Sequence, residues 1–215
     1  MFFAATGHYE QNIYMVPEAE LIVVFTGFIP DEILHPTEGP MYRYILAACT
    51  DMPYEALHQT YADNGLIMEY PTGFNLAEIP LPETGTLDSG SGLLQLRFDS
   101  YPFELIQVMW REAEPGLEPD TYREKLFGSL SLQTGIELKS GDTWESKKDQ
   151  HAIFNQYFDY AEQGIQLRGV TGVWYCDETG RVIAFNYVTN PEVSDQALES
   201  KYQEHLDSLS CHDGG

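Results

Sequence analysis

The sequence predicts an α+β protein, on three observations. Of its 215 residues, 43% are hydrophobic and 13% are aromatic, which supplies enough apolar side chain for a packed core. Short runs rich in β-branched and aromatic residues, bounded by Gly, Pro and Asp, are typical of antiparallel strands. Two stretches, residues 119–136 and the one that begins at Ser194, place apolar residues at helical spacing. We therefore expect an antiparallel sheet with helices packed on it.

The first 50 residues form a segment of their own. Residues 12–16 and 21–25 are two apolar runs separated by Pro-Glu-Ala-Glu, which predicts a β-hairpin, and the second run indicates burial on both faces. Residues 28–39 are rich in Pro and Gly and indicate a loop, and residues 41–49 indicate a short helix. Because an isolated hairpin is only marginally stable, we expect another part of the protein or a second copy to cover it.

A change of pattern predicts a linker at residues 51–64 and a second domain at residues 65–215. The turn residues 177–180 predict a tight hairpin, and Ser194 predicts the N-cap of a closing helix. Asp120 is the expected N-cap of the helix at residues 119–136. Extended segments are expected within residues 65–76, 93–98, 104–110, 152–161, 167–176 and 182–189.

Two resemblances to known families follow from these segments. Residues 2–27, with His8 ahead of a Pro-Glu corner and a Val-Val-Phe-Thr strand, resemble the last hairpin of a β-lactamase-related serine hydrolase. The later region resembles the PsbP-like fold, on residues 70–74 (YPTGF), residues 172–181 (GVWYCDETGR) and the helix that ends at residues 207–212 (DSLSCH). The second resemblance implies an accessory or binding module without a catalytic centre.

The hydrolase resemblance implies chemistry that this chain does not carry. Those enzymes use a Ser-x-x-Lys pair, in which the lysine takes the serine proton, and a Tyr-x-Asn element. Neither motif occurs in the sequence, and the nearest approach is Tyr61-Ala62-Asp63-Asn64. We therefore expect no turnover by this chain. His8 would only line the active-site rim of a longer parent, a serine hydrolase acting outside the cytoplasm.

Three cysteines carry the other candidate chemistry. Cys176 ends a predicted strand and Cys211 follows the closing helix, so packing of that helix on the sheet can bring them into a disulfide; the alternative is two separate thiols. A disulfide would imply an oxidising compartment, whereas Cys49 is expected in the core. A cysteine hydrolase is the catalytic alternative, and it needs a thiol beside a histidine. Cys211 and His212 are neighbours in the sequence, but their side chains are expected to point apart. His205, Cys211 and His212 match no zinc spacing, so neither a metal nor a cofactor is expected.

Aromatic residues predict the binding surface. Trp144, Tyr157 and Tyr160 lie among polar neighbours and are the candidates for an exposed ligand groove. The alternative is that they simply complete the core, as strand and helix spacing predicts for Trp110, Phe154, Phe158 and Trp174. The basic pair Lys147-Lys148 forms either a small contact patch with Trp144 or a solvated loop. His151, close to Asp149, is a candidate for titration near neutral pH.

Charge excludes whole classes of partner. With 34 acidic against 11 basic residues, the formal net charge is −23, which repels nucleic acid and anionic lipid. No run of eighteen apolar residues predicts a membrane-spanning helix. Two functions remain: the non-catalytic C-terminal part of a serine hydrolase, partnered by the hydrolase body, or an independent binding module. In the second, the first hairpin completes a sheet or pairs two copies of the chain.

Overall fold

The computed structural model describes residues 3–6, 12–16, 21–25, 58–71, 73–81, 87–88, 90–98, 103–116, 118–131, 136–162 and 165–212. The chain divides into two compact units. The first comprises Met1–Gln59, Pro71–Phe74 and Phe98–Tyr101, and the second comprises Thr60–Tyr70, Asn75–Arg97 and Pro102–Gly215. In the ranges given above, no helix combines the length and the apolar character that crossing a bilayer requires.

A three-stranded antiparallel sheet belongs to the first unit. Strands β1 (Phe3–Thr6), β2 (Asn12–Val16) and β3 (Leu21–Phe25) lie in the order β1-β2-β3. Because β2 and β3 pair antiparallel, the predicted hairpin is confirmed. Ile22 and Val24 of β3 are exposed, so the expected burial of this strand on both faces is wrong for the face that carries them. Pairing of two copies through this hairpin stays a prediction.

Several predictions for the first unit fall outside the described residues. These are the positions of His8 and Cys49, the loop at residues 28–39 and the helix at residues 41–49. Within residues 51–64, where the sequence predicts a linker, the structure has strand β4 (His58–Asp63).

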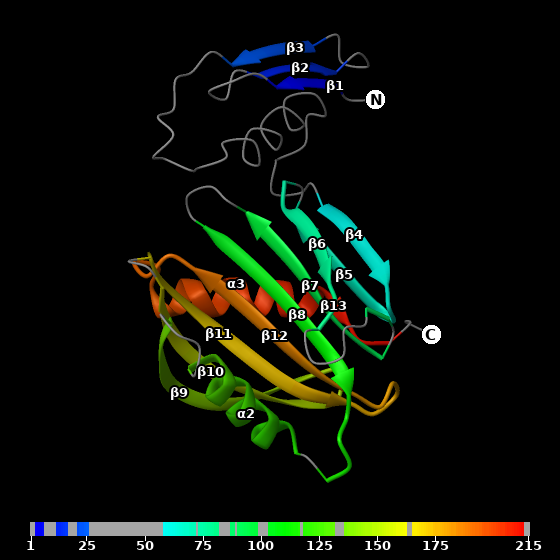
Figure 1. The fold of residues 1–215 in the computed structure, drawn as a ribbon, viewed down its shortest axis with the longest axis vertical. Coiled ribbons are helices and arrows are strands. Elements are labelled where there is room, and N and C mark those ends of the chain that lie inside the picture. Colours follow the sequence, from blue (N-terminus) through cyan, green and yellow to red (C-terminus); the bar gives the residue numbers. More distant parts are fainter. Residues whose placement is uncertain are drawn as a thin grey trace. The chain divides into compact units, whose positions relative to one another are not determined.

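Two further sheets are built from the remaining strands (Figure 1). The larger has the order β6-β7-β8-β12-β11-β10-β9, and a small one has the order β13-β5-β4. Pairing is antiparallel wherever the register is defined, as between β11 and β12, which meet at the tight turn predicted at residues 177–180. The bounds are β5 Leu66–Pro71, β6 Asn75–Ile79, β7 Ser91–Phe98, β8 Glu104–Glu112, β9 Ile136–Lys148, β10 His151–Glu162, β11 Ile165–Cys176, β12 Arg181–Thr189 and β13 Leu209–Ser210.

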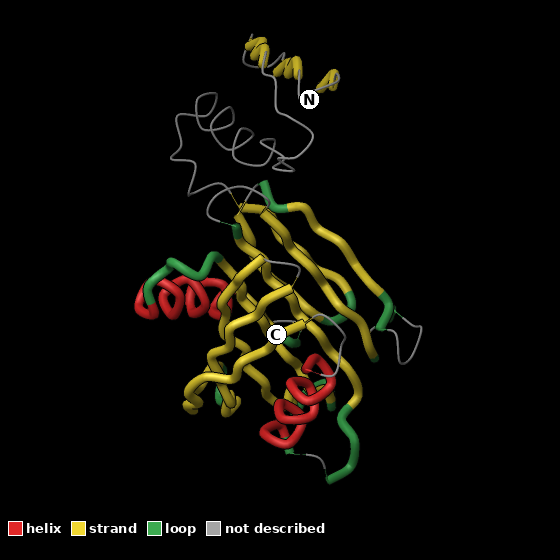
Figure 2. Tube along the Cα trace, turned by 60° about the vertical axis from the view of Figure 1, so that its left-hand side comes forward, coloured by secondary structure: helices red, strands yellow, loops and turns green. Residues whose placement is uncertain are grey.

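Two helices flank the large sheet, α2 (Pro119–Ser131) on one face and α3 (Asp195–Ser208) on the other (Figures 1 and 2). Every residue of β12 is buried, and its side chains alternate between the two faces. Ala184 packs with Tyr122 of α2, whereas the ring of Phe185 lies 5.5 Å from that of Tyr202 of α3. The centre of the sheet is therefore covered on both sides, which explains the near-continuous apolar sequence of β12.

The expected α+β class, a sheet with helices packed on it, is wrong for the chain as a whole. Strands account for most of the described residues, and those residues hold two helices, so the protein is mostly β. The reason lies mainly in a strand that the sequence pattern does not reveal. Strand β9 runs for 13 residues where the sequence pattern predicts no strand, and β10 and β11, of 12 residues each, extend slightly beyond the segments predicted at residues 152–161 and 167–176. Antiparallel pairing between strands, rather than packing of helices on a sheet, thus organises most of this part of the chain.

Strand β9 is the largest element that the sequence analysis missed. It occupies residues where the end of a helix and a loop with Lys147-Lys148 were expected, and α2 ends earlier, at Ser131. Asp120 lies in the first turn of α2, where it pairs with Arg123 at 2.6 Å, and is not the N-cap. Because β9 is an edge strand paired only with β10, it tolerates many polar side chains and lacks an apolar alternation.

Helix α3 matches its prediction. Its N-cap is Ser194, whose hydroxyl accepts a hydrogen bond from the Ala197 amide at 3.3 Å. The helix buries one stripe of side chains, Leu198, Tyr202, His205 and Leu206. Beneath it, the Tyr202 hydroxyl donates to Oδ1 of Asn155 on β10 at 2.6 Å, which provides a buried partner for both groups.

Alkaline pH should destabilise this core, because burial raises the pKa of Tyr202 and also that of Tyr187, where the Glu104 carboxylate adds to the effect. In the unfolded chain these phenols lose their protons near the ordinary pKa of 10.0, whereas in the folded protein they keep them. Below about pH 10, the two neutral phenols make their full contribution to the free energy of unfolding. Above that pH the contribution falls by about 1.4 kcal/mol per pH unit for each tyrosine. Urea unfolding measured from about pH 9 to about pH 11 checks this, and Tyr202→Phe should reduce the slope.

Candidate functional site

A shallow groove of about 330 Å³ lies between strand β9 and helix α3. One wall is Trp144, and the helix supplies the others. The lining residues are Trp144, Gln196, Glu199, Ser200, Tyr202 and Gln203. Trp144 is half-buried, while Glu199 and Gln203 are exposed. The groove therefore combines an aromatic ring with a carboxylate and two amides that face solvent.

Tyr157 of β10 extends the aromatic wall. Its ring centroid lies 4.7 Å from that of Trp144, at an angle of 41°. Its hydroxyl donates a hydrogen bond to the Glu199 carboxylate across the groove. Partial burial, and then this carboxylate, raise the pKa of Tyr157 above the ordinary range, so the phenol stays neutral. An ordered aromatic pair beside a carboxylate suits a cationic group, which can lie over a ring face and pair with the acid.

The predicted groove residues separate into two groups. Trp144 lines the groove, and Tyr157 packs against it. Tyr160 lies further along β10, opposite Leu138 of β9, and is not part of the lining. Lys148 takes no part in an aromatic patch: its ammonium group pairs with Asp149 at 2.9 Å and donates to the Asp207 carbonyl at 3.0 Å. The hydrogen bond from Lys148 to the Asp149 carboxylate lowers the pKa of Asp149.

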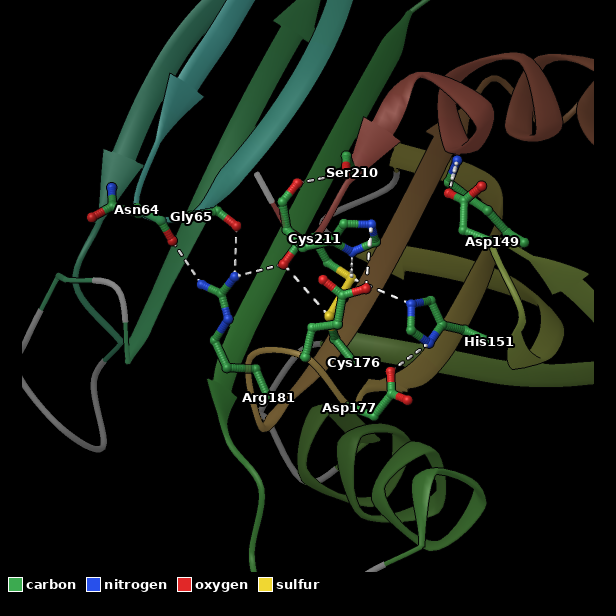
Figure 3. Close-up of a disulfide and its surroundings, with 12 residues drawn as sticks. Asn64, Gly65, Asp149, His151, Cys176, Asp177, Arg181, Ser210 and Cys211 are labelled. Atoms are coloured by element: carbon green, nitrogen blue, oxygen red, sulfur yellow. Dashed lines mark hydrogen bonds and ion pairs between the residues drawn. A yellow bond between two sulfur atoms is a disulfide. The ribbon is translucent and has the colours of Figure 1, made fainter. Parts of the chain in front are cut away.

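A second constellation surrounds the cysteines (Figure 3). The structure joins Cys176, at the end of β11, to Cys211, just after β13, in a disulfide with Cα atoms 6.6 Å apart. Both cysteines are buried. Arg181 lies on one side, with its guanidinium donating to the Cys211 carbonyl at 3.0 Å, and His151 lies on the other.

Two histidines complete this cluster. Nε2 of His151 and Nδ1 of His212 lie 3.8 and 3.6 Å from Sγ of Cys211. The four potential ligand atoms of His151, Cys176, Cys211 and His212 all lie within 4.8 Å of one another. These are donors that could hold a metal ion. The expectation that Cys211 and His212 point apart is wrong, because both lie beyond the end of α3, where helical geometry no longer applies.

Sequence reasoning missed this cluster because it considered a different histidine. His205 is buried in α3, where its ring lies 5.5 Å from that of Tyr187 and 3.7 Å from a Glu104 carboxylate oxygen. The histidine that lies beside Cys211 together with His212 is His151, which is 60 residues away from Cys211 along the chain. A compact Cys-His spacing could not reveal the cluster, since its members come from three separate segments.

No protein-family model and no curated protein sequence matches the chain. Among solved structures, cyanobacterial PsbP (CyanoP) from Synechocystis sp. PCC 6803 is similar, with a TM-score of 0.53 and 13% identity, over 72% of this chain and 92% of that chain. A Pseudomonas aeruginosa protein of unknown function, PA94, has a TM-score of 0.41 and 14% identity, over 74% of this chain and 100% of that chain. The PsbP-like fold predicted for the larger part of the chain is thereby confirmed. Nothing in these comparisons supports the resemblance of residues 1–50 to serine hydrolases.

Proposed function

We propose that the chain is a non-catalytic binding module that captures a basic segment of a partner protein. The observation that carries this proposal is the groove between β9 and α3, where Trp144 and Tyr157 stand beside the Glu199 carboxylate. A lysine or arginine side chain can lay its methylene stem on the aromatic rings and place its charge near Glu199.

Electrostatics and fold support the same function. The formal net charge of −23 raises the local concentration of cationic partners and opposes anionic ones. The PsbP-like fold favours an accessory module, although a fold alone fixes no function. The absence of Ser-x-x-Lys and Tyr-x-Asn from the sequence favours the same role, and we propose that the chain hydrolyses neither β-lactams nor esters.

Titration with short peptides tests the groove. An acetylated oligolysine or oligoarginine should bind saturably and change the fluorescence of Trp144, because Trp110 and Trp174 are buried elsewhere in the core. Binding should weaken as salt rises, and an oligoglutamate of equal length should not bind. Calorimetry on Trp144→Ala should show at least a tenfold loss of affinity, in line with about 1.4 kcal/mol or more for a cation–aromatic contact and its packing.

Two matched variants decide whether the groove itself is responsible. Glu199→Gln and Glu204→Gln remove the same charge from α3, but Glu204 pairs with Lys201 and does not line the groove. Only Glu199→Gln should weaken peptide binding beyond the small shift expected from net charge. Equal loss in both variants, or unchanged affinity in Trp144→Ala, would show that the peptide responds only to the acidic surface and would refute the proposed site.

A further inference from the structure

We propose that, once the Cys176–Cys211 disulfide is reduced, His151, Cys176, Cys211 and His212 bind one zinc ion as a Cys₂His₂ site, so that disulfide and metal are alternative cross-links of the same segments. The four ligand atoms already lie within 4.8 Å of one another, although they come from three separate segments of the chain. This site is separate from the groove and does not depend on the function proposed for it.

The geometry fits a tetrahedral zinc ion. With Zn–S near 2.3 Å and Zn–N near 2.0 Å, a tetrahedral arrangement places sulfur and nitrogen about 3.5 Å apart. The observed separations of Sγ of Cys211 from Nδ1 of His212 and Nε2 of His151 are 3.6 and 3.8 Å. Reduction must free the two sulfurs so that each can take its own position around the ion.

Each histidine also has a carboxylate at its other ring nitrogen. Nδ1 of His151 lies 3.5 Å from Asp177, and Nε2 of His212 lies 3.9 Å from Glu178. Histidine ligands of zinc commonly donate this second N–H to a carboxylate, which sets the ring orientation and raises the basicity of the ligating nitrogen. The end of β11 thus supplies one ligand, Cys176, and the turn that follows it supplies a carboxylate beside each imidazole. Figure 3 shows Asp177 beside His151.

Burial and charge favour zinc binding by two thiolates and two imidazoles. The two cysteines are 0% and 4% exposed, where a bare thiolate would be costly. Two thiolates and two neutral imidazoles bring the total charge with Zn²⁺ to zero, so the loaded site can stay buried. Thiolate and imidazole ligands select zinc over magnesium and calcium, which prefer the carboxylate oxygens that are abundant on this acidic surface.

The exchange is balanced in atoms and electrons. A dithiol reductant gives two electrons and two protons to the Cys176–Cys211 bond and becomes a disulfide itself, which leaves two thiols. Zn²⁺ then displaces both thiol protons to solvent, bonds the two sulfurs, and takes a lone pair from each imidazole nitrogen. Oxidation of the two thiolates by a disulfide releases the ion and restores the cross-link.

Cobalt titration of the whole chain tests this proposal. The protein carries Cys49→Ser, so that the remaining thiols are those of the cluster, and it is reduced with a phosphine. We expect one Co²⁺ per chain, with the intense visible bands of tetrahedral cobalt and a thiolate charge-transfer band, both lost on addition of one equivalent of Zn²⁺. The oxidised protein should give neither band, and excess Mg²⁺ should not compete.

Variants locate the ligands. His212→Gln keeps both cysteines and still forms the disulfide, so its folding can be verified in the oxidised state; when reduced, it should bind at least about 100-fold more weakly. Asp177→Asn should weaken binding by roughly 10- to 100-fold, whereas the exposed His58→Gln should leave it unchanged. Absence of the charge-transfer band in the reduced protein, or cobalt binding that His212→Gln does not affect, would overturn the site and leave only adventitious carboxylate binding.

Discussion

Arg181→Ala should lower the free energy of unfolding by about 2–3 kcal/mol, because the buried carbonyl of Cys211 and the half-buried carbonyls of Asn64 and Gly65 lose their donor, and a buried carbonyl without one costs about 1–3 kcal/mol. The guanidinium of Arg181, 3% exposed, donates to the carbonyls of Asn64 and Gly65 at 2.6 Å each and to that of Cys211 at 3.0 Å. One side chain therefore ties the β4–β5 turn and the segment after α3 to strand β12 (Figure 3). Urea unfolding of the two proteins, followed by circular dichroism, measures the loss.

The stability that Arg181 provides should depend on the planar shape of its guanidinium and not on its charge alone. In Arg181→Lys, a compact ammonium group keeps the charge but cannot reach three carbonyls with a planar fork, so most of the stability should still be lost. Arg111 provides the comparison, since it pairs with the exposed Glu114 at 2.8 Å and its guanidinium lies 5.6 Å from the centre of the Tyr122 ring. Arg111→Ala should cost about 1 kcal/mol. A free energy of unfolding of Arg181→Ala within about 1 kcal/mol of the parent would contradict this role of the Arg181 hydrogen bonds.

Gly172→Ala should cost about 2–3 kcal/mol, because the methyl group would occupy space already filled beneath α3. A Cβ atom on Gly172 would lie 2.0 Å from the Tyr202 hydroxyl oxygen and 3.0 Å from Oδ1 of Asn155 and Cγ2 of Ile153. Relief of this clash requires a shift of the Tyr202 ring or of helix α3, and either movement disturbs the buried Tyr202–Asn155 hydrogen bond. Thermal and urea unfolding of the variant measure the cost.

A double-mutant cycle identifies the clashing atom. Tyr202→Phe removes the oxygen at 2.0 Å, and the nearest remaining contacts of the added methyl group are then those at 3.0 Å. The alanine should therefore cost at least about 1 kcal/mol less in the Tyr202→Phe background than in the parent. Gly180→Ala serves as the comparison, since its Cβ meets no atom within 4 Å and its cost comes from a φ of +68°. Additive effects of Gly172→Ala and Tyr202→Phe would rule out this contact.

Local signals in the sequence predicted the elements whose geometry is set within a few residues. Ser194 and the apolar stripe from Leu198 to Leu206 predicted α3, because a cap and a helical face act over one or two turns. The turn that ends at Gly180, which has a φ of +68°, predicted the β11–β12 hairpin. Trp144 was predicted at a binding surface from its polar neighbours, and the structure places it in the groove.

Only the tertiary structure decided the features that depend on contacts between distant segments. Strand β9 has a polar sequence and is held by pairing with β10, so its own residues favour no strand and the strand content was underestimated. Tyr160 and Tyr157 have similar neighbours in the sequence, yet the strand places Tyr157 beside Trp144 and Tyr160 further along. His151, Cys176 and the Cys211–His212 pair meet because the start of β10, the end of β11 and the segment after α3 lie at one place. The sequence therefore determined the N-cap of α3, the β11–β12 turn and the kinds of donor atom, whereas strand pairing and helix packing brought those donors into one site.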